Sequence, residues 1–151
     1  MAKHPNVGDP APDFELEGTS GRFKLSEHRG ERVILLFYPG DNTPVCTRQL
    51  NSYTEDISQF DSVGAQVLAI SPQSIASHDR FASKHGFKFP LLADTEKVVA
   101  GAYGTLGPLG FPRRSVFVVD ADGVIRYAHR AIAGFTFRPT KELVAAVRDA
   151  S

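Results

Sequence analysis

The stretch of sequence that decides the fold is residues 33–46, which read VILLFYPGDNTPVC. Its first five residues are all apolar, which is typical of a strand covered on both faces of a sheet. Pro39 and Gly40 end that strand, and Pro44 suits the first turn of a helix, where its missing N–H group has no partner to lose. The stretch therefore predicts a buried strand, a short loop and the start of a helix, in that order.

Further strands and helices are expected on both sides of this stretch. Apolar patterns predict strands at residues 14–16, 33–37, 67–70, 115–119 and 124–127. A short apolar segment at residues 89–92 contains a proline, which favours the edge of a sheet or a bend. Helices are predicted over about residues 45–60, from a cap at Ser74 or Ser77 to Gly86, over residues 98–103, and from Pro139 onward.

The order of these elements indicates the class of fold. A β-α-β start is followed by a β-hairpin, whose turn is formed by residues 120–123 (DADG), and by a final helix. This order predicts an α/β protein with the thioredoxin-like fold, in which a mixed central sheet has helices on both faces. The β-α-β half would supply parallel strands, and the hairpin would supply an antiparallel edge. A single domain over residues 1–151 suits a chain of this length.

Composition and charge exclude several classes of function. The chain has 17 Lys and Arg against 17 Asp and Glu, so it lacks the basic surface that nucleic-acid-binding proteins need. The first residues, MAKHP, contain no apolar signal core, and the longest apolar run is far too short to span a bilayer. We therefore expect a cytoplasmic protein with neither a nucleic-acid nor a membrane partner.

Cys46 is the one cysteine in the chain, so an internal disulfide, a C-x-x-C redox pair and a thiolate zinc site are all excluded. A lone cysteine can be a small, inert core residue or a reactive thiol. The predicted position of Cys46 favours the second reading, because it lies in the first turn of a helix beyond the carboxyl end of a central strand. Free N–H groups and the positive end of the helix dipole stabilise a thiolate there.

Several segments, in the same order along the chain, resemble the peroxiredoxins. Residues 39–46 read P-x-x-x-T-x-x-C, which is similar to the active-site signature of that family. Residues 8–14, GDPAPDF, resemble its N-terminal motif, and residues 114–120, RSVFVVD, resemble its R-x-x-F-x-x-D strand. Residues 77–81, SHDRF, and 89–94, FPLLAD, resemble the branch called bacterioferritin comigratory protein or peroxiredoxin Q.

The resemblance implies a thiol-dependent peroxidase that reduces hydrogen peroxide and organic hydroperoxides. Cys46 would attack one peroxide oxygen and become a sulfenic acid. Arg114 would supply a permanent positive charge for the thiolate and for the peroxide oxygens. The Thr43 hydroxyl would bind the peroxide or the thiolate and fix the line of attack. Alternation along the strand puts Arg113 and Arg114 on opposite faces, and the register of the motif favours Arg114.

Three more residues are expected to bind substrate or to support the site. Pro39 would shield the thiolate from water, and the amides of Val45 and Cys46 would complete a cradle for the oxygens. Gln49 stands one helical turn after Cys46, where relatives carry Glu or Gln to hold the arginine. No metal or cofactor is expected, because His78 and His85 have no acidic or thiolate companion and the glycines of residues 101–110 match no nucleotide-binding motif.

The sequence departs from the branch pattern at one position. Many relatives carry a second, resolving cysteine five residues after the first, and this chain has Asn51 there. The sulfenic acid would therefore have to react with an external thiol, such as thioredoxin, a glutaredoxin-like protein or a low-molecular-weight thiol. We expect a monomer or a weak homodimer.

Two other functions remain open at this point. A redox-sensing partner or a holdase chaperone could use the same fold without consuming peroxide. A thiol–disulfide oxidoreductase of the thioredoxin type is disfavoured by the missing C-x-x-C pair.

Overall fold

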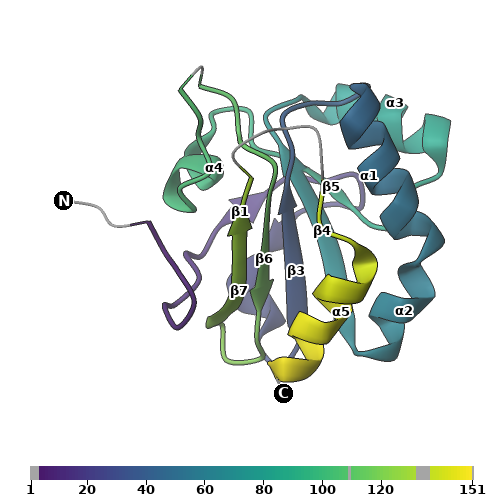
Figure 1. The fold of residues 1–151 in the computed structure, drawn as a ribbon. Helices are drawn as coiled ribbons and strands as arrows, with labels where there is room; N and C mark the ends of the chain where they lie inside the picture. The colour runs from purple at the N-terminus through teal and green to yellow at the C-terminus, as the bar shows by residue number, and fades with distance from the viewer. Residues whose placement is uncertain (1–3, 109, 132–136, 151) are drawn as a thin grey trace.

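A computed structural model describes residues 4–108, 110–131 and 137–150 (Figure 1). In chain order its elements are β1 (Glu15–Leu16), β2 (Phe23–Lys24), the 3-10 helix η1 (Leu25–His28), β3 (Arg32–Phe37), α1 (Pro44–Glu55), α2 (Ile57–Ser62), β4 (Ala65–Ser71), α3 (Ile75–His85), β5 (Leu91–Ala93), α4 (Val98–Ala102), β6 (Ser115–Val119), β7 (Ile125–Arg130) and α5 (Thr140–Asp149). None of the helices within these ranges has the length and apolar character needed to cross a membrane.

The central sheet has five strands in the order β5-β4-β3-β6-β7. β3 pairs with β4 in parallel, and β4 pairs with β5 in parallel. β6 runs antiparallel to β3, and the β6–β7 hairpin places β7 at the edge. The predicted mixed sheet, with parallel strands from the β-α-β half and an antiparallel edge from the hairpin, is confirmed.

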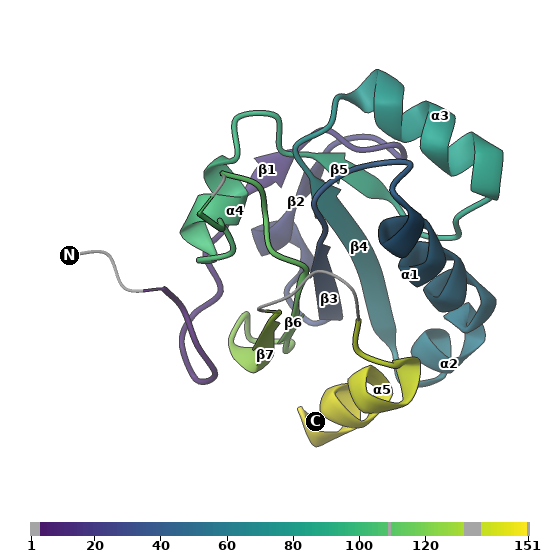
Figure 2. The same cartoon turned by 45° about the horizontal axis from the view of Figure 1, so that its top comes forward.

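The side chains of β3 alternate between two separate cores. Ile34 and Leu36 belong to a core shared with α1, α2, α3 and α5, whereas Val33 and Leu35 belong to a core on the opposite face. That second face is covered by α4 and by the small antiparallel sheet of β1 and β2 (Figure 2), and Leu25 of η1 also belongs to this core. Helices on both faces are therefore confirmed. The strand expected at residues 14–16 is present as β1, whereas the sequence patterns do not indicate β2, its partner in the small sheet.

The helix expected over residues 45–60 is wrong as a single element. It breaks at Asp56 into α1 and α2. The Asp56 carboxylate accepts a hydrogen bond from Thr140 Oγ1 at 2.7 Å and another from Gln59 Nε2 at 3.3 Å. Aspartate competes with helical hydrogen bonding through such local contacts, and here it also ties the break to the start of α5.

The expected ends of α3 agree with the structure. Ser74 is the N-cap, and its hydroxyl accepts a hydrogen bond from the Ser77 amide at 3.2 Å. Gly86 ends the helix in the left-handed region, with φ of 65°, where a side chain would add strain. At the other end of the chain, β7 reaches Arg130 and is thus longer than the predicted strand at 124–127.

The β6–β7 turn depends on Asp120. Its Oδ1 accepts hydrogen bonds from the amides of Asp122 and Val124, each at 2.9 Å, and its Oδ2 accepts one from Arg126 Nε at 2.6 Å. Burial alone would raise the pKa of the Asp120 carboxyl, but the hydrogen bonds from Val124, Arg126 and Asp122 lower it. The folded chain therefore favours the carboxylate form.

We expect Asp120→Ala to lower the free energy of unfolding at pH 7 by about 2 kcal/mol, because two turn amides lose their acceptor. A carboxyl group whose pKa is lowered by folding stabilises the folded state at pH values above its pKa in the unfolded chain, which is about 3.9 for aspartate. This stabilisation is lost as the pH falls. The difference between wild type and variant should therefore shrink below about pH 4. Urea unfolding at several pH values measures it, and a difference that stays constant down to pH 3 would contradict this assignment.

Candidate active site

The turn that carries Cys46 follows directly from the end of β3. Thr43 is the N-cap of α1 with an extended backbone, and Pro44 is the first helical residue, as predicted. Cys46 is therefore the third residue of the helix. The amides of Val45 and Cys46 have no carbonyl partner four residues earlier within the helix. The positive end of the helix thus lies beside the thiol, at the carboxyl end of a central strand.

The register of β3 with β6 brings Arg114 to this turn. Phe37 pairs with Ser115, so Arg114 lies one residue beyond the paired ends. It shares its parity along the strand with Val116, which belongs to the same core as Cys46. The Arg114 side chain lies on the α1 face of the sheet, where it is 5% exposed, whereas the neighbouring Arg113 is exposed. The register thus brings Arg114, and not Arg113, to Cys46.

Arg114 contacts the thiol and Gln49 at the same time. Its Nη2 donates to Cys46 Sγ at 3.3 Å, and its Nη1 donates to Gln49 Oε1 at 2.6 Å. Cys46 is fully buried, and Gln49 is 2% exposed. The guanidinium thus places a positive charge beside the sulfur atom, and its planar fork can hold two partners in fixed directions.

Gln49 lies on the buried face of α1 together with Cys46, Leu50 and Tyr53. Burial raises the pKa of Tyr53 to about 12, so this phenol is neutral near pH 7. Its hydroxyl donates to the carbonyl of Arg138, which precedes α5. The amide of Gln49 is therefore enclosed by packed side chains, and it offers Arg114 a fixed acceptor.

We expect Gln49→Leu to slow the reaction of Cys46 with peroxide about tenfold, because the guanidinium loses its fixed acceptor while its charge stays. Gln49→Glu should retain more of the rate, since a carboxylate also accepts from Arg114. Stopped-flow measurement of the second-order rate constant distinguishes the two variants. A Gln49→Leu rate equal to that of the wild type would show that Gln49 does not orient the arginine.

The other predicted site residues lie in the loop before α1 and in the first turn of that helix. Thr43 is exposed, and Pro39 and Val45 are half-buried. The Thr43 hydroxyl donates to the Gly40 carbonyl at 3.2 Å, so its lone pairs, and not its proton, are left to bind a substrate. This geometry favours the reading in which Thr43 accepts a hydrogen bond from a peroxide. The roles of Thr43, Pro39 and Val45 toward a substrate stay predictions.

Sequence reasoning missed a buried polar cluster behind the same loop. Asp41 accepts hydrogen bonds from Tyr38 Oη at 2.7 Å, Ser77 Oγ at 2.7 Å and His78 Nδ1 at 2.8 Å. Burial alone would raise the pKa of the Asp41 carboxyl, but these bonds, led by that of His78, lower it. The signal available was the resemblance of residues 77–81 to one branch of the family, which did not reveal the partner of His78.

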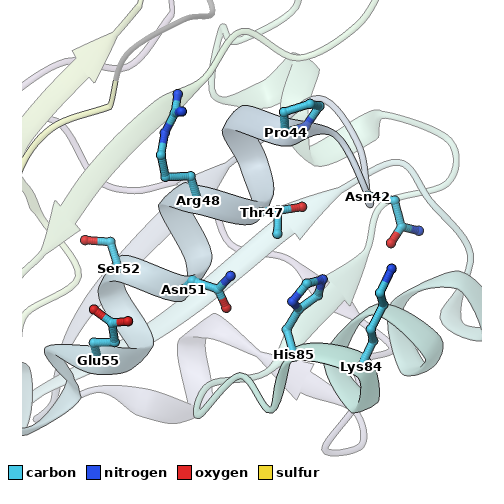
Figure 3. Close-up of a pocket in the computed structure, with 9 residues that line it drawn as sticks. All are labelled: Asn42, Pro44, Thr47, Arg48, Asn51, Ser52, Glu55, Lys84 and His85. Carbon is cyan, nitrogen blue, oxygen red and sulfur yellow. The ribbon is translucent and has the colours of Figure 1, made fainter.

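A groove of about 550 Å³ runs between α1 and α3, on the outer side of the helix that carries Cys46 (Figure 3). Its lining is polar and includes three basic side chains; the lining residues are Asn42, Pro44, Thr47, Arg48, Asn51, Ser52, Glu55, Lys84 and His85. Asn51 thus lies on the outer side of α1, whereas Cys46 lies in the core on its inner side. Within the described residues, no three His, Cys, Asp or Glu side chains gather in a way that could hold a metal ion.

The fold and this site can be compared with those of known proteins. Residues 7–128 match the AhpC/TSA family. Chloroplastic peroxiredoxin Q of Arabidopsis thaliana is 36% identical to this chain over a stretch that covers 91% of this chain and 63% of the relative. The chain therefore belongs to the AhpC/TSA family, in the branch of peroxiredoxin Q and the bacterioferritin comigratory proteins.

Solved structures agree with this placement. Peroxidoxin BcpB of Mycobacterium tuberculosis has 29% sequence identity and a TM-score of 0.87, over 98% of this chain and 99% of its own. The bacterioferritin comigratory protein of Xanthomonas campestris, studied for its alkyl peroxide reduction activity, has 27% sequence identity and a TM-score of 0.85. This match covers 95% of this chain and 98% of that protein. The chain spans 62% to 63% of the length of the cereal and Arabidopsis relatives that it matches.

Proposed function

We propose that this chain is a thiol-dependent peroxidase in which Cys46 is the nucleophile. The contact that carries the proposal is the 3.3 Å hydrogen bond from Arg114 Nη2 to Cys46 Sγ, made by a guanidinium that Gln49 holds from its other side. A buried thiol kept only for packing has no need of a buried positive charge. Membership of the AhpC/TSA family supports the same function.

The first step is a displacement at oxygen. The Cys46 thiolate forms a bond to one peroxide oxygen while the O–O bond breaks, and the other oxygen leaves with the electron pair as hydroxide or alkoxide. Taking up a proton turns it into water or an alcohol, and Cys46 becomes a sulfenic acid. The charge that develops on the oxygens lies near Arg114 and the first amides of α1, which stabilise it without rearrangement.

The second step needs a thiol from outside the chain, because Cys46 has no partner cysteine in the sequence. An external thiolate attacks the sulfenic sulfur, water leaves, and a mixed disulfide forms. A second external thiol then displaces Cys46 as the thiol and carries away the disulfide. Thioredoxin, a glutaredoxin-like protein and a low-molecular-weight thiol are all chemically suitable donors.

The substrates in this proposal are hydrogen peroxide and organic hydroperoxides. The alkyl peroxide reduction named for the Xanthomonas campestris relative supports the second class. We further propose a cytoplasmic enzyme that works as a monomer or a weak homodimer. The proposal includes no metal or cofactor, since the sulfur of Cys46 carries both electrons.

Peroxide consumption measured with a panel of thiol donors tests this function. Reduced protein should consume hydrogen peroxide or cumene hydroperoxide catalytically with at least one donor among thioredoxin, glutaredoxin with glutathione, and dithiothreitol. With no donor, it should rapidly consume about one peroxide per chain, and any further loss should end once the sulfenic acid is oxidised to sulfinic or sulfonic acid. Two results would contradict the proposal. One is catalytic consumption of peroxide without any donor, and the other is consumption no faster than the donor's own background with every donor of the panel.

A further inference from the structure

The buried position of Cys46 poses a problem for the second half of the cycle. Its side chain is fully buried and packs in the same core as Leu50 and Tyr53. A small peroxide needs only a narrow path, but the sulfur of a thioredoxin-sized donor must come within bonding distance of Cys46. The turn that carries Cys46 must therefore move outward before the sulfenic acid can react with such a donor.

Asp41 is the residue that joins the loop before this turn to a different helix. Two of its hydrogen-bond donors, Ser77 and His78, belong to α3, and the third, Tyr38, stands at the end of β3. The side chains of Asp41 and His78 are both completely buried. The next residue, Asn42, has a left-handed backbone with φ of 63°, so the chain turns sharply between Asp41 and the start of α1. We call the contacts of Asp41 with Ser77 and His78 the anchor of the loop.

His78 is itself fixed from its other side. Its Nε2 lies 3.0 Å from the carbonyl oxygen of Leu92 in β5, and its Nδ1 lies 2.8 Å from Asp41 Oδ2. The ring of His78 thus lies between an acceptor on the loop and an acceptor on β5. The anchor therefore runs from the loop through α3 to the edge strand of the sheet, all of it out of water.

The contact between Arg114 and Cys46 also has to break when the turn opens, whereas two other hydrogen bonds of the loop are local. Thr43 Oγ1 donates to Gly40 within the loop itself, and the Thr43 carbonyl accepts from Thr47 inside the first turn of α1. Both of these bonds can move outward together with the turn. The bonds of Asp41 to Ser77 and His78 cannot, because their donors stay on α3.

We propose that Asp41, held by Ser77 and His78, is a positioning residue that sets how often the turn carrying Cys46 opens to an external thiol. This inference rests on the proposed function and assigns a part of the loop to the step that regenerates the enzyme. In the closed form Arg114 and Cys46 meet and peroxide reacts. In the open form, reached by breaking the Asp41 contacts, the sulfenic sulfur is exposed to the donor.

Three variants test the proposal. Asp41→Asn keeps the size of the side chain and removes the charge that receives three donors. Ser77→Ala removes one donor at a half-buried position and leaves the His78 contact, so it serves if Asp41→Asn does not fold. Asp79→Asn is the matched control, since it makes the same charge change at an exposed residue of α3, next to His78.

The first measurement uses no peroxide. Reduced protein is treated with iodoacetamide, and alkylation of Cys46 is followed by mass spectrometry beside backbone hydrogen exchange. We expect Asp41→Asn to be alkylated about tenfold faster than wild type, Ser77→Ala a few-fold faster, and Asp79→Asn at the wild-type rate. Faster exchange should be confined to residues 38–46 and spare β4. Unchanged alkylation in folded Asp41→Asn and Ser77→Ala, or faster exchange that includes β4, would overturn the proposal.

The second measurement separates the two halves of the cycle. With a protein donor at limiting concentration, Asp41→Asn should raise the rate of sulfenic acid reduction about as much as it raises alkylation, while the rate constant for peroxide changes less than about twofold. A loss in both steps would show a general structural role and overturn the proposal. The two proposals fail separately. Alkylation requires no turnover, so it tests the opening of the turn, whereas the donor panel tests the peroxidase function.

Discussion

Replacing Cys46 by serine is expected to abolish catalytic peroxide consumption with every donor. The chain contains no other thiol, and a hydroxyl is not ionised near neutral pH even beside a guanidinium. The remaining rate should equal that of the donor alone. Because serine is nearly the size of cysteine and lies beside Arg114, the fold should persist, which circular dichroism and thermal unfolding can verify.

A matched control for this variant is Asn51→Ser, which makes a small polar change on the outer side of the same helix. It should keep the wild-type rate. Peroxide consumption by Cys46→Ser above the donor background would show that another group performs the chemistry. Protection of an aggregating client protein by Cys46→Ser, with no peroxide activity in the wild type, would instead favour a holdase.

Removal of the Arg114 charge has the second largest expected effect. Arg114→Met keeps much of the side-chain volume but removes the donors to Cys46 Sγ and Gln49 Oε1. We expect the rate constant for peroxide to fall about 10²- to 10³-fold, the usual loss when a preorganised donor to developing negative charge is removed. Arg114→Lys should fall between, since an ammonium keeps the charge but cannot hold both partners in the arginine geometry.

Arg113→Met provides the control for Arg114→Met. The two residues are adjacent, yet Arg113 is exposed whereas Arg114 is 5% exposed beside the thiol. Stopped-flow kinetics with hydrogen peroxide should therefore give nearly wild-type rates for Arg113→Met. A loss of similar size in both variants would indicate a general charge effect and not a specific contact with Cys46.

The parts of the fold that local chemistry decides could be predicted from the sequence. The apolar run of β3, the proline at the first position of α1 and the turn glycine of the β6–β7 hairpin each act within a few residues. They sufficed to place Cys46 at the start of a helix beyond a central strand. Parity along a strand also placed Arg113 and Arg114 on opposite faces, and the register of the family motif then favoured Arg114.

Contacts between distant residues could not be predicted in the same way. The break at Asp56 depends on Thr140, which is 84 positions away, and the anchor of Asp41 depends on His78, 37 positions away. Each of these residues reads as an ordinary polar residue in its own segment. The strand expected at residues 14–16 is present as β1, but its two-residue partner β2 is too short to show a period, so the pairing of the second small sheet could not be predicted.

The central claim is that Cys46 takes one oxygen atom from peroxide and needs an external thiol to lose it. Mass spectrometry of the reduced protein after one equivalent of hydrogen peroxide, with a 1,3-dione present to trap sulfenic acid, tests this directly. We predict one dione adduct per chain, located at Cys46 and absent when a thiol donor that supports turnover is added before the dione. Disappearance of the peroxide with Cys46 unmodified, or with the oxygen found on Met1, would contradict the account.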